Sequence, residues 1–95
     1  MDGRKVDREA AERFGKNLWR ARRRAGQSQE ALGVLTSLHR TEIGLLERGK
    51  RLPRVDTLMK LADALEVPME SLLEGIEWLP PGSSVGGSFV VRREA

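Results

Sequence analysis

Two polar residues at the start of a short predicted helix have the chemistry to read a base pair. Arg40 and Thr41 follow His39, a plausible N-cap, and precede the inward-facing residues Ile43 and Leu46. An arginine carries a planar donor fork that meets guanine O6 and N7 together, and a threonine offers its hydroxyl to a base edge or its methyl to thymine. The major groove of DNA accepts a short helix with such residues at its N-terminal end. We therefore expect Arg40 and Thr41 to contact bases.

Further side chains are candidates for the same face. Leu45 follows Thr41 by about one helical turn, which places it within reach of a thymine methyl. Gln29, in the first turn of the preceding predicted helix, is expected to face a phosphate or an outer base pair. Glu42 takes part only by accepting from a cytosine N4 amine, because its carboxylate otherwise repels phosphate. Gly44 removes a side chain near the expected groove floor.

Phosphate contacts are expected on either side of these residues. Ser28 and His39 each begin a predicted helix, where backbone N–H groups suit phosphate oxygens. Arg48, Lys50 and Arg51 follow the second of these helices and are expected to bind the DNA backbone, which gives affinity and salt dependence without sequence reading. His39 is the only histidine in a chain without cysteine, so it fits a cap or phosphate contact better than a metal site or a catalyst, and we expect no cofactor.

Apolar periodicity predicts five helices that position these residues. The first is expected over residues 8–25 with Asp7 as its N-cap, and Gly26 and Gly49 end the first and third helices. In chain order, the expected inward residues are Phe14, Leu18, Ala21 and Ala25; Leu32 and Leu35 after the N-cap Ser28; Ile43 and Leu46 after the N-cap His39; Leu58, Leu61, Ala62 and Leu65 in a helix over 55–66; and Leu72 and Leu73 after Pro68.

The period changes after Gly75. Two runs rich in strand formers, 76–79 and 88–92, flank a segment rich in proline, glycine and serine. This pattern predicts a β-hairpin with a long loop or two strands that pair with another chain, and a disordered tail is the alternative that its apolar content argues against. We expect a dimer contact from its apolar residues, which are Ile76, Trp78, Leu79, Phe89, Val90 and Val91.

Composition limits the remaining possibilities. The net charge is +3, but residues 1–27 carry nine Lys and Arg against four Asp and Glu, whereas residues 55–95 carry three against seven. A basic front and an acidic back suggest one face for a polyanion and another that stays away from it. The absence of cysteine excludes disulfides, and a polar N-terminus with no long apolar run predicts a soluble, cytoplasmic protein without membrane contact. We expect a flexible segment over 1–7, a helical domain over 8–75 and a β-rich dimerisation segment over 76–95.

The chain resembles the Cro/XRE family of lambda-repressor-like helix-turn-helix domains over about residues 12 to 74. The residues that carry the resemblance are Phe14, Gly15, Leu18, Arg22, Gly26, Ser28, Gln29, Glu30, Leu32, Ile43, Glu47, Arg48, Gly49, Pro53, Leu58, Leu61, Ala62 and Leu65. The run from Leu38 to Gly49 looks most like restriction-modification controller proteins and small regulators. The sequence departs from the family pattern at Gly33, where alanine is usual, at Ser37, where the turn has glycine, and at Thr36, where an apolar residue is common.

The resemblance implies an all-α fold of five helices, here followed by a short β-hairpin or strand pair. It also implies an internal ion pair between Arg22 and Glu47, and a transcriptional regulator that binds a palindromic operator in double-stranded DNA as a homodimer. An antitoxin or co-regulator that uses the same fold to bind a protein is the alternative. No enzyme site, small-molecule ligand or metal is expected, since the chain has no cysteine nucleophile, histidine pair or glycine-rich phosphate loop.

Overall fold

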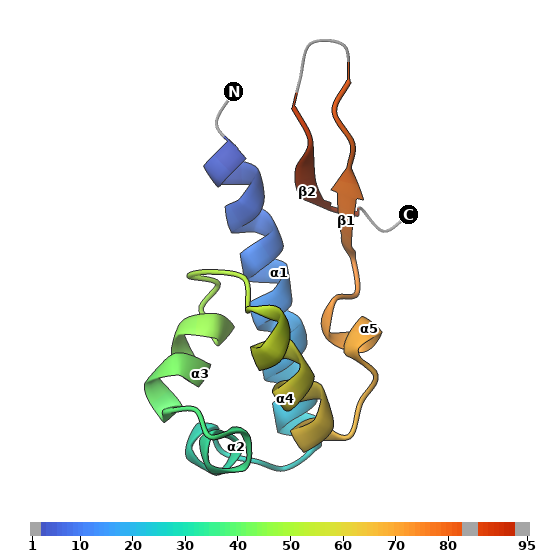
Figure 1. The fold of residues 1–95 in the computed structure, drawn as a ribbon. Helices are drawn as coiled ribbons and strands as arrows, with labels where there is room; N and C mark the ends of the chain where they lie inside the picture. Colours follow the sequence, from blue (N-terminus) through green and yellow to red (C-terminus); the bar gives the residue numbers. More distant parts are fainter. Residues whose placement is uncertain (1–2, 83–85, 93–95) are drawn as a thin grey trace.

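The computed structural model describes residues 3–82 and 86–92, which form five helices followed by a two-stranded sheet (Figure 1). The elements are α1 (Gly3–Arg24), α2 (Gln29–Thr36), α3 (Arg40–Glu47), α4 (Val55–Leu65), α5 (Met69–Leu72), β1 (Ile76–Leu79) and β2 (Ser88–Val91). The expected all-helical domain with a C-terminal strand pair is confirmed. None of the helices in the described part of the chain is long and apolar enough to span a bilayer.

Helix α1 is the axis of the fold and is longer than expected. It begins at Gly3, so residues 3–7 are helical, and the prediction of Asp7 as an N-cap is wrong. The residues before Asp7 include lysine, arginine and valine and contain no helix-ending signal after Gly3, so nothing stops the helix from extending toward the N-terminus. Residues 1 and 2 lie outside the described residues. At the other end, Gly26 adopts φ +70° two residues after the last residue of the helix, Arg24, as expected for a glycine that ends it.

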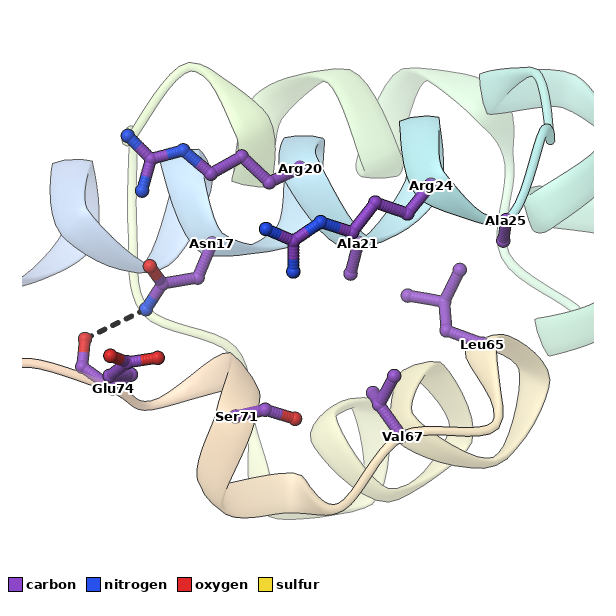
Figure 2. Close-up of a pocket in the computed structure, with 9 residues that line it drawn as sticks. All are labelled: Asn17, Arg20, Ala21, Arg24, Ala25, Leu65, Val67, Ser71 and Glu74. Carbon is purple, nitrogen blue, oxygen red and sulfur yellow. Dashed lines mark hydrogen bonds between the residues drawn. The ribbon is translucent and has the colours of Figure 1, made fainter.

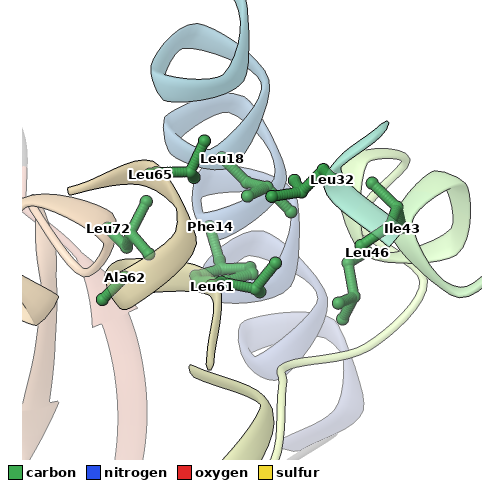
Figure 3. Close-up of a cluster of buried hydrophobic side chains, with 9 residues drawn as sticks. All are labelled: Phe14, Leu18, Leu32, Ile43, Leu46, Leu61, Ala62, Leu65 and Leu72. Carbon is green, nitrogen blue, oxygen red and sulfur yellow. The ribbon is translucent and has the colours of Figure 1, made fainter. Parts of the chain in front are cut away.

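The core is a single cluster to which all five helices contribute (Figure 3). Helix α1 lies between the α2–α3 pair on one side and the hairpin on the other (Figure 1). Each fully buried leucine, isoleucine or phenylalanine side chain stabilises the fold by roughly 1.5–3 kcal/mol relative to the same side chain left exposed. The buried members are Phe14, Leu18, Leu32, Ile43, Leu46, Leu61, Ala62, Leu65 and Leu72.

Three of the expected inward residues are exposed instead. Leu35 is 60% exposed, Leu73 is 36% exposed, and Ala25, which follows the last residue of α1, is exposed as well, so these three predictions are wrong. In α2, Thr36 takes the buried position, one turn after Leu32, and its hydroxyl donates to the Leu32 carbonyl at 2.8 Å. Because this bond satisfies the hydroxyl, threonine occupies an apolar position without leaving an unpaired polar group. In α5, the short helix turns only Leu72 toward the core.

The turn between α2 and α3 explains why alanine is absent from position 33. Ser37 adopts the left-handed conformation at φ 60°, and the Leu38 amide donates to the Gly33 carbonyl at 2.9 Å. This turn brings the Leu38 carbonyl so close to α2 that a Cβ on Gly33 would lie 2.5 Å from its oxygen. The two departures from the family pattern therefore belong together, because the serine turn fits against a helix that has no side chain at position 33.

The C-terminal segment folds back as a hairpin within one chain. β1 and β2 pair antiparallel, with Ile76 opposite Val91 and Trp78 opposite Phe89, whose rings meet edge-on with centroids 5.2 Å apart. A side chain of α1 fixes the start of this hairpin: Asn17 is buried, and its Nδ2 donates to the carbonyls of Leu72 at 3.0 Å and Glu74 at 2.9 Å. Of the alternatives for this segment, the described residues form the intrachain hairpin, and Ser83, Ser84 and Val85 of its loop lie outside the described residues.

The α2–α3 turn leads to a prediction about stability. Gly33→Ala is expected to lower the free energy of unfolding by about 1–3 kcal/mol, because its Cβ must displace the Leu38 carbonyl. Ser37→Gly is the matched variant and is expected to raise it by about 1 kcal/mol, because glycine adopts the left-handed conformation without a Cβ penalty. Urea unfolding followed by circular dichroism measures both. Equal midpoints for Gly33→Ala and wild type would contradict the described turn.

Candidate nucleic-acid interface

The N-termini of α2 and α3 are both closed by side-chain caps. Ser28 Oγ accepts from the Ala31 amide at 3.0 Å, and His39 Nδ1 accepts from the Thr41 amide at 3.0 Å, as the sequence predicted. His39 Nδ1 also lies 2.8 Å from Thr41 Oγ1. A ring nitrogen that accepts from a backbone amide carries no proton, so the Thr41 hydroxyl donates to it. This arrangement holds the Thr41 side chain in place at the exposed end of α3.

The outer face of α3 carries Arg40, Thr41 and Leu45, three of the residues predicted to contact bases. Arg40 and Thr41 are exposed in its first turn, while Ile43 and Leu46 fix the opposite face in the core. Leu45 is half-buried one turn beyond Thr41. The helix is thus held by its apolar face, and its N-terminal turn projects away from the core. This geometry allows the first turn of α3 to enter a groove.

A buried ion pair ties α3 to α1. Arg22 Nε donates to Glu47 Oε2 at 2.5 Å and Arg22 Nη2 to Glu47 Oε1 at 2.9 Å, with side-chain exposures of 10% and 5%. Arg22 Nη1 also donates to the Gln27 carbonyl at 2.9 Å. The hydrogen bonds to Glu47 raise the pKa of Arg22, and its partial burial opposes this rise. The ion pair that the family resemblance implied is present, and both carboxylate oxygens of Glu47 accept a hydrogen bond from Arg22.

Gln29 is attached to this pair. Its Nε2 donates to Glu47 Oε1 at 3.0 Å, so one carboxylate orients both the arginine of α1 and the amide at the start of α2. Gln29 is half-buried and lies on the flank of α3 rather than extending freely into solvent. The sequence placed Gln29 at this interface, but nothing in its spacing indicated that Glu47 would hold it.

Glu42 and Arg51 form a second ion pair at the other flank of α3. Arg51 Nη2 donates to Glu42 Oε1, and the side chains are 55% and 28% exposed for Arg51 and Glu42 respectively. The carboxylate therefore has a cation beside it on the predicted DNA face, which reduces its repulsion of phosphate. The sequence assigned Glu42 to bases and Arg51 to phosphate separately, whereas the structure brings them together.

The other cations of this face are uncommitted. Within the described ranges, the side chains of Arg40, Arg48 and Lys50 are exposed and have no hydrogen-bond or ion-pair partner. Guanidinium and ammonium groups that are not neutralised internally remain available to an anionic partner. Together with the two helix N-termini, they give the α2–α3 end of the molecule a positive surface.

A separate cleft of about 280 Å³ lies between α1 and the segment that runs from the end of α4 through α5 (Figure 2). Ser71 contributes a hydroxyl group to the lining of this cleft. Ser71 Oγ donates to the Pro68 carbonyl at 2.6 Å, so the hydroxyl is not activated as a nucleophile. No group of three or more His, Cys, Asp and Glu side chains in the described part of the chain is arranged to hold a metal ion. The cleft is lined by Asn17, Arg20, Ala21, Arg24, Ala25, Leu65, Val67, Ser71 and Glu74.

A family model described as a helix-turn-helix domain matches residues 13–74. The chain belongs to the helix-turn-helix family. The match covers α2, α3 and the helices that support them, which are the elements that carry the surface described above. The expected Cro/XRE, lambda-repressor-like type is confirmed by the solved structures that resemble the chain.

Relatives of this helix-turn-helix chain include regulators. It is 36% identical over 69 residues to the uncharacterized HTH-type transcriptional regulator y4dJ from Sinorhizobium fredii, covering 73% of this chain and 90% of that protein. It is 37% identical, with a TM-score of 0.63, to the restriction-modification controller protein C.AhdI from Aeromonas hydrophila, covering 65% and 94% of the two chains. The P22 c2 repressor in complex with a synthetic operator is 27% identical, with a TM-score of 0.62, over 65% and 94%. The chain is a DNA-binding transcriptional regulator of this family.

The buried ion pair leads to a prediction about stability. Glu47→Gln is expected to lower the free energy of unfolding by about 3–5 kcal/mol, because it leaves the Arg22 charge buried without its counter-ion. Glu77→Gln is the matched control, since Glu77 pairs with Arg92 at 3.0 Å on the surface, with side chains 48% and 56% exposed. The control should cost less than about 1 kcal/mol. Chemical unfolding of both variants measures the difference, and equal losses would contradict a buried, structural pair.

Proposed function

We propose that this helix-turn-helix chain binds a palindromic DNA operator as a homodimer, as a repressor or autoregulator, and that α3 reads the major groove. The observation that supports this most is the first turn of α3. Arg40 and Thr41 are exposed there, His39 caps the turn, and the opposite face of the helix is buried in the core. Two such helices about one turn of DNA apart would read two half-sites. Binding, not catalysis, is the activity we propose, and it would take place in the cytoplasm with the chromosome.

The contacts that we propose divide into two kinds. Arg40 and Thr41 read bases at the N-terminal end of α3, Leu45 contacts a thymine methyl, and Gln29 contacts an outer base pair from its fixed position beside Glu47. Glu42 affects base preference together with Arg51, since the two side chains are paired. Phosphate contacts come from the helix N-termini at Ser28 and His39 and from the cations that follow α3, which are Arg48, Lys50 and Arg51.

Support for a homodimer comes from apolar side chains that the fold leaves exposed at the α5–hairpin side of the molecule. Trp78 is 55% exposed, Leu79 is 54% exposed and Phe89 is 41% exposed, and Leu73 adds a further apolar group from the end of α5. Large apolar side chains that the fold leaves exposed are typical of an interaction surface, and here Trp78 and Phe89 lie on one face of the hairpin and Leu79 on the other. We propose that a second copy covers this side. Ile76 packs on the core and Val90 and Val91 are half-buried, so the contact depends mainly on Trp78, Leu79 and Phe89.

Arg40 provides the direct test of base reading. Arg40→Ala is expected to lower the affinity for the operator by about 1–3 kcal/mol while affinity for random DNA falls much less, because a bidentate guanine contact is lost. The operator is first selected from a random DNA pool with the wild-type protein, and fluorescence anisotropy then compares the two DNAs. Lys50→Ala is the control, and it should weaken both complexes equally. An equal loss on both DNAs for Arg40→Ala would count against base reading.

The exposed side of the hairpin tests the homodimer. Leu79→Glu is expected to convert the dimer to a monomer and to weaken binding to the palindromic operator by about 2 kcal/mol or more, because it places a charge in the proposed interface. Met59→Glu puts the same charge on an exposed position of α4 and should leave the dimer intact. Analytical ultracentrifugation gives the mass. A Leu79→Glu protein that stays dimeric with full operator affinity would favour the alternative, in which this surface binds a different protein, as an antitoxin or co-regulator does.

A further inference from the structure

Gly44 makes a notch in the outer surface of α3. A Cβ at this position would lie 3.1 Å from Arg48 Nη1 and 3.9 Å from Arg48 Cζ, so the guanidinium of Arg48 occupies the space beside the glycine. The same Cβ would lie 3.7 Å from Gln29 Oε1. Gly44 is buried although it is on the outward side of the helix, because these two side chains cover it. The notch is therefore filled by groups from α2 and from the end of α3.

The direction of Arg48 follows from helix geometry. Arg48 is four residues after Gly44 and caps the C-terminus of α3, and helical side chains lean back toward the N-terminus over the preceding turn. Its guanidinium consequently lies one turn beyond Arg40 and Thr41 on the same side of the helix. In the part of the chain that the structure describes, no side chain or carbonyl accepts from it. The N–H groups of the Arg48 guanidinium are thus free to donate on the face of α3 that also carries Arg40.

Gln29 meets this notch in a fixed orientation. Because its Nε2 donates to Glu47, its other amide atom, Oε1, is turned toward Gly44 and borders the same notch as the Arg48 guanidinium. An amide oxygen and a guanidinium at one notch offer an acceptor and a planar set of donors, which is the combination that base edges in the major groove match. Phosphate oxygens, by contrast, are acceptors only and have no use for the amide oxygen.

We propose that Arg48 is a second base-reading residue, which Gly44 positions by leaving room for its guanidinium beside Gln29. This inference rests on the proposed DNA-reading function and changes one of its contacts: position after α3 alone assigns Arg48 to the phosphate backbone, whereas the space beside Gly44 assigns it to a base. The preferred partner is a guanine, whose O6 and N7 accept the two parallel donors of an arginine. Gly44 is a positioning residue, since it acts only through Arg48 and Gln29.

The experiment measures the ratio of affinities for operator and random DNA, using the operator selected by the wild-type protein and a shuffled duplex of equal length. Arg48→Ala is expected to lower this ratio by about five- to hundredfold, as the loss of one bidentate base contact does. Lys50→Ala is the control for a phosphate contact. It should leave the ratio unchanged and reduce the slope of log affinity against log salt by about 1.

Gly44→Ala separates positioning from folding. Its Cβ displaces only the flexible end of Arg48, and alanine favours the helix, so the unfolding midpoint should stay the same or rise while the affinity ratio falls. The double variant Gly44→Ala, Arg48→Ala should be no worse than Arg48→Ala alone, because both changes remove one contact. An unchanged ratio for Arg48→Ala, with a smaller salt slope, would overturn base reading by Arg48. Full discrimination by a stable Gly44→Ala protein would overturn the positioning role, and no enriched operator for wild type would overturn the proposed function itself.

Discussion

The ion pair between Arg22 and Glu47 joins three parts of the fold that have no covalent reason to stay together. Arg22 comes from the end of α1, Glu47 from the end of α3, and the Gln27 carbonyl from the loop before α2. The same carboxylate holds the amide of Gln29 at 3.0 Å. A buried charge that lost its partner would be strongly unfavourable, so the relative placement of α1, α2 and α3 is held closely. This pair therefore fixes the direction in which the outward face of α3 points relative to α1 and α2.

Close backbone approach is the second constraint on the site. A Cβ on Gly15 of α1 would lie 2.5 Å from the Glu47 carbonyl, so α1 and the end of α3 touch directly where the ion pair forms. Gly33 does the same for the turn that separates α2 from α3. These two glycines serve packing, whereas Gly44 leaves space that mobile side chains occupy. The distinction matters because only the third position can accept a methyl group without shifting the backbone.

The hairpin has the predicted strands, but residues of α1 that the sequence did not indicate attach it to the helical domain. Strand formers on either side of proline and glycine predicted two strands, and their pairing within one chain is now described. Asn17 and Arg13, whose Nε donates to the Glu74 carbonyl at 3.2 Å, attach the start of the hairpin to α1. Neither residue was expected to do this, because each lies more than fifty positions from its partner. Trp78 and Phe89 contact each other across the hairpin, yet both rings and Leu79 stay exposed, so the fold does not bury them.

Local signals by themselves determined the helices, their caps at Ser28 and His39, most of the core and the position of Arg40 and Thr41 on an outer face, because periodicity and capping depend on neighbours a few residues away. They failed at Leu35, whose place in the core is taken by Thr36 with its hydroxyl bonded to the Leu32 carbonyl, and at Asp7, because no local signal stops α1 before Gly3. Only the tertiary structure decided which charges are neutralised. Glu42 with Arg51 and Glu47 with Gln29 are pairs formed across loops, and Arg48 is left uncommitted beside Gly44. Spacing along the chain does not encode such pairs, since the first depends on how the loop after α3 folds back along that helix and the second on how α2 and α3 cross.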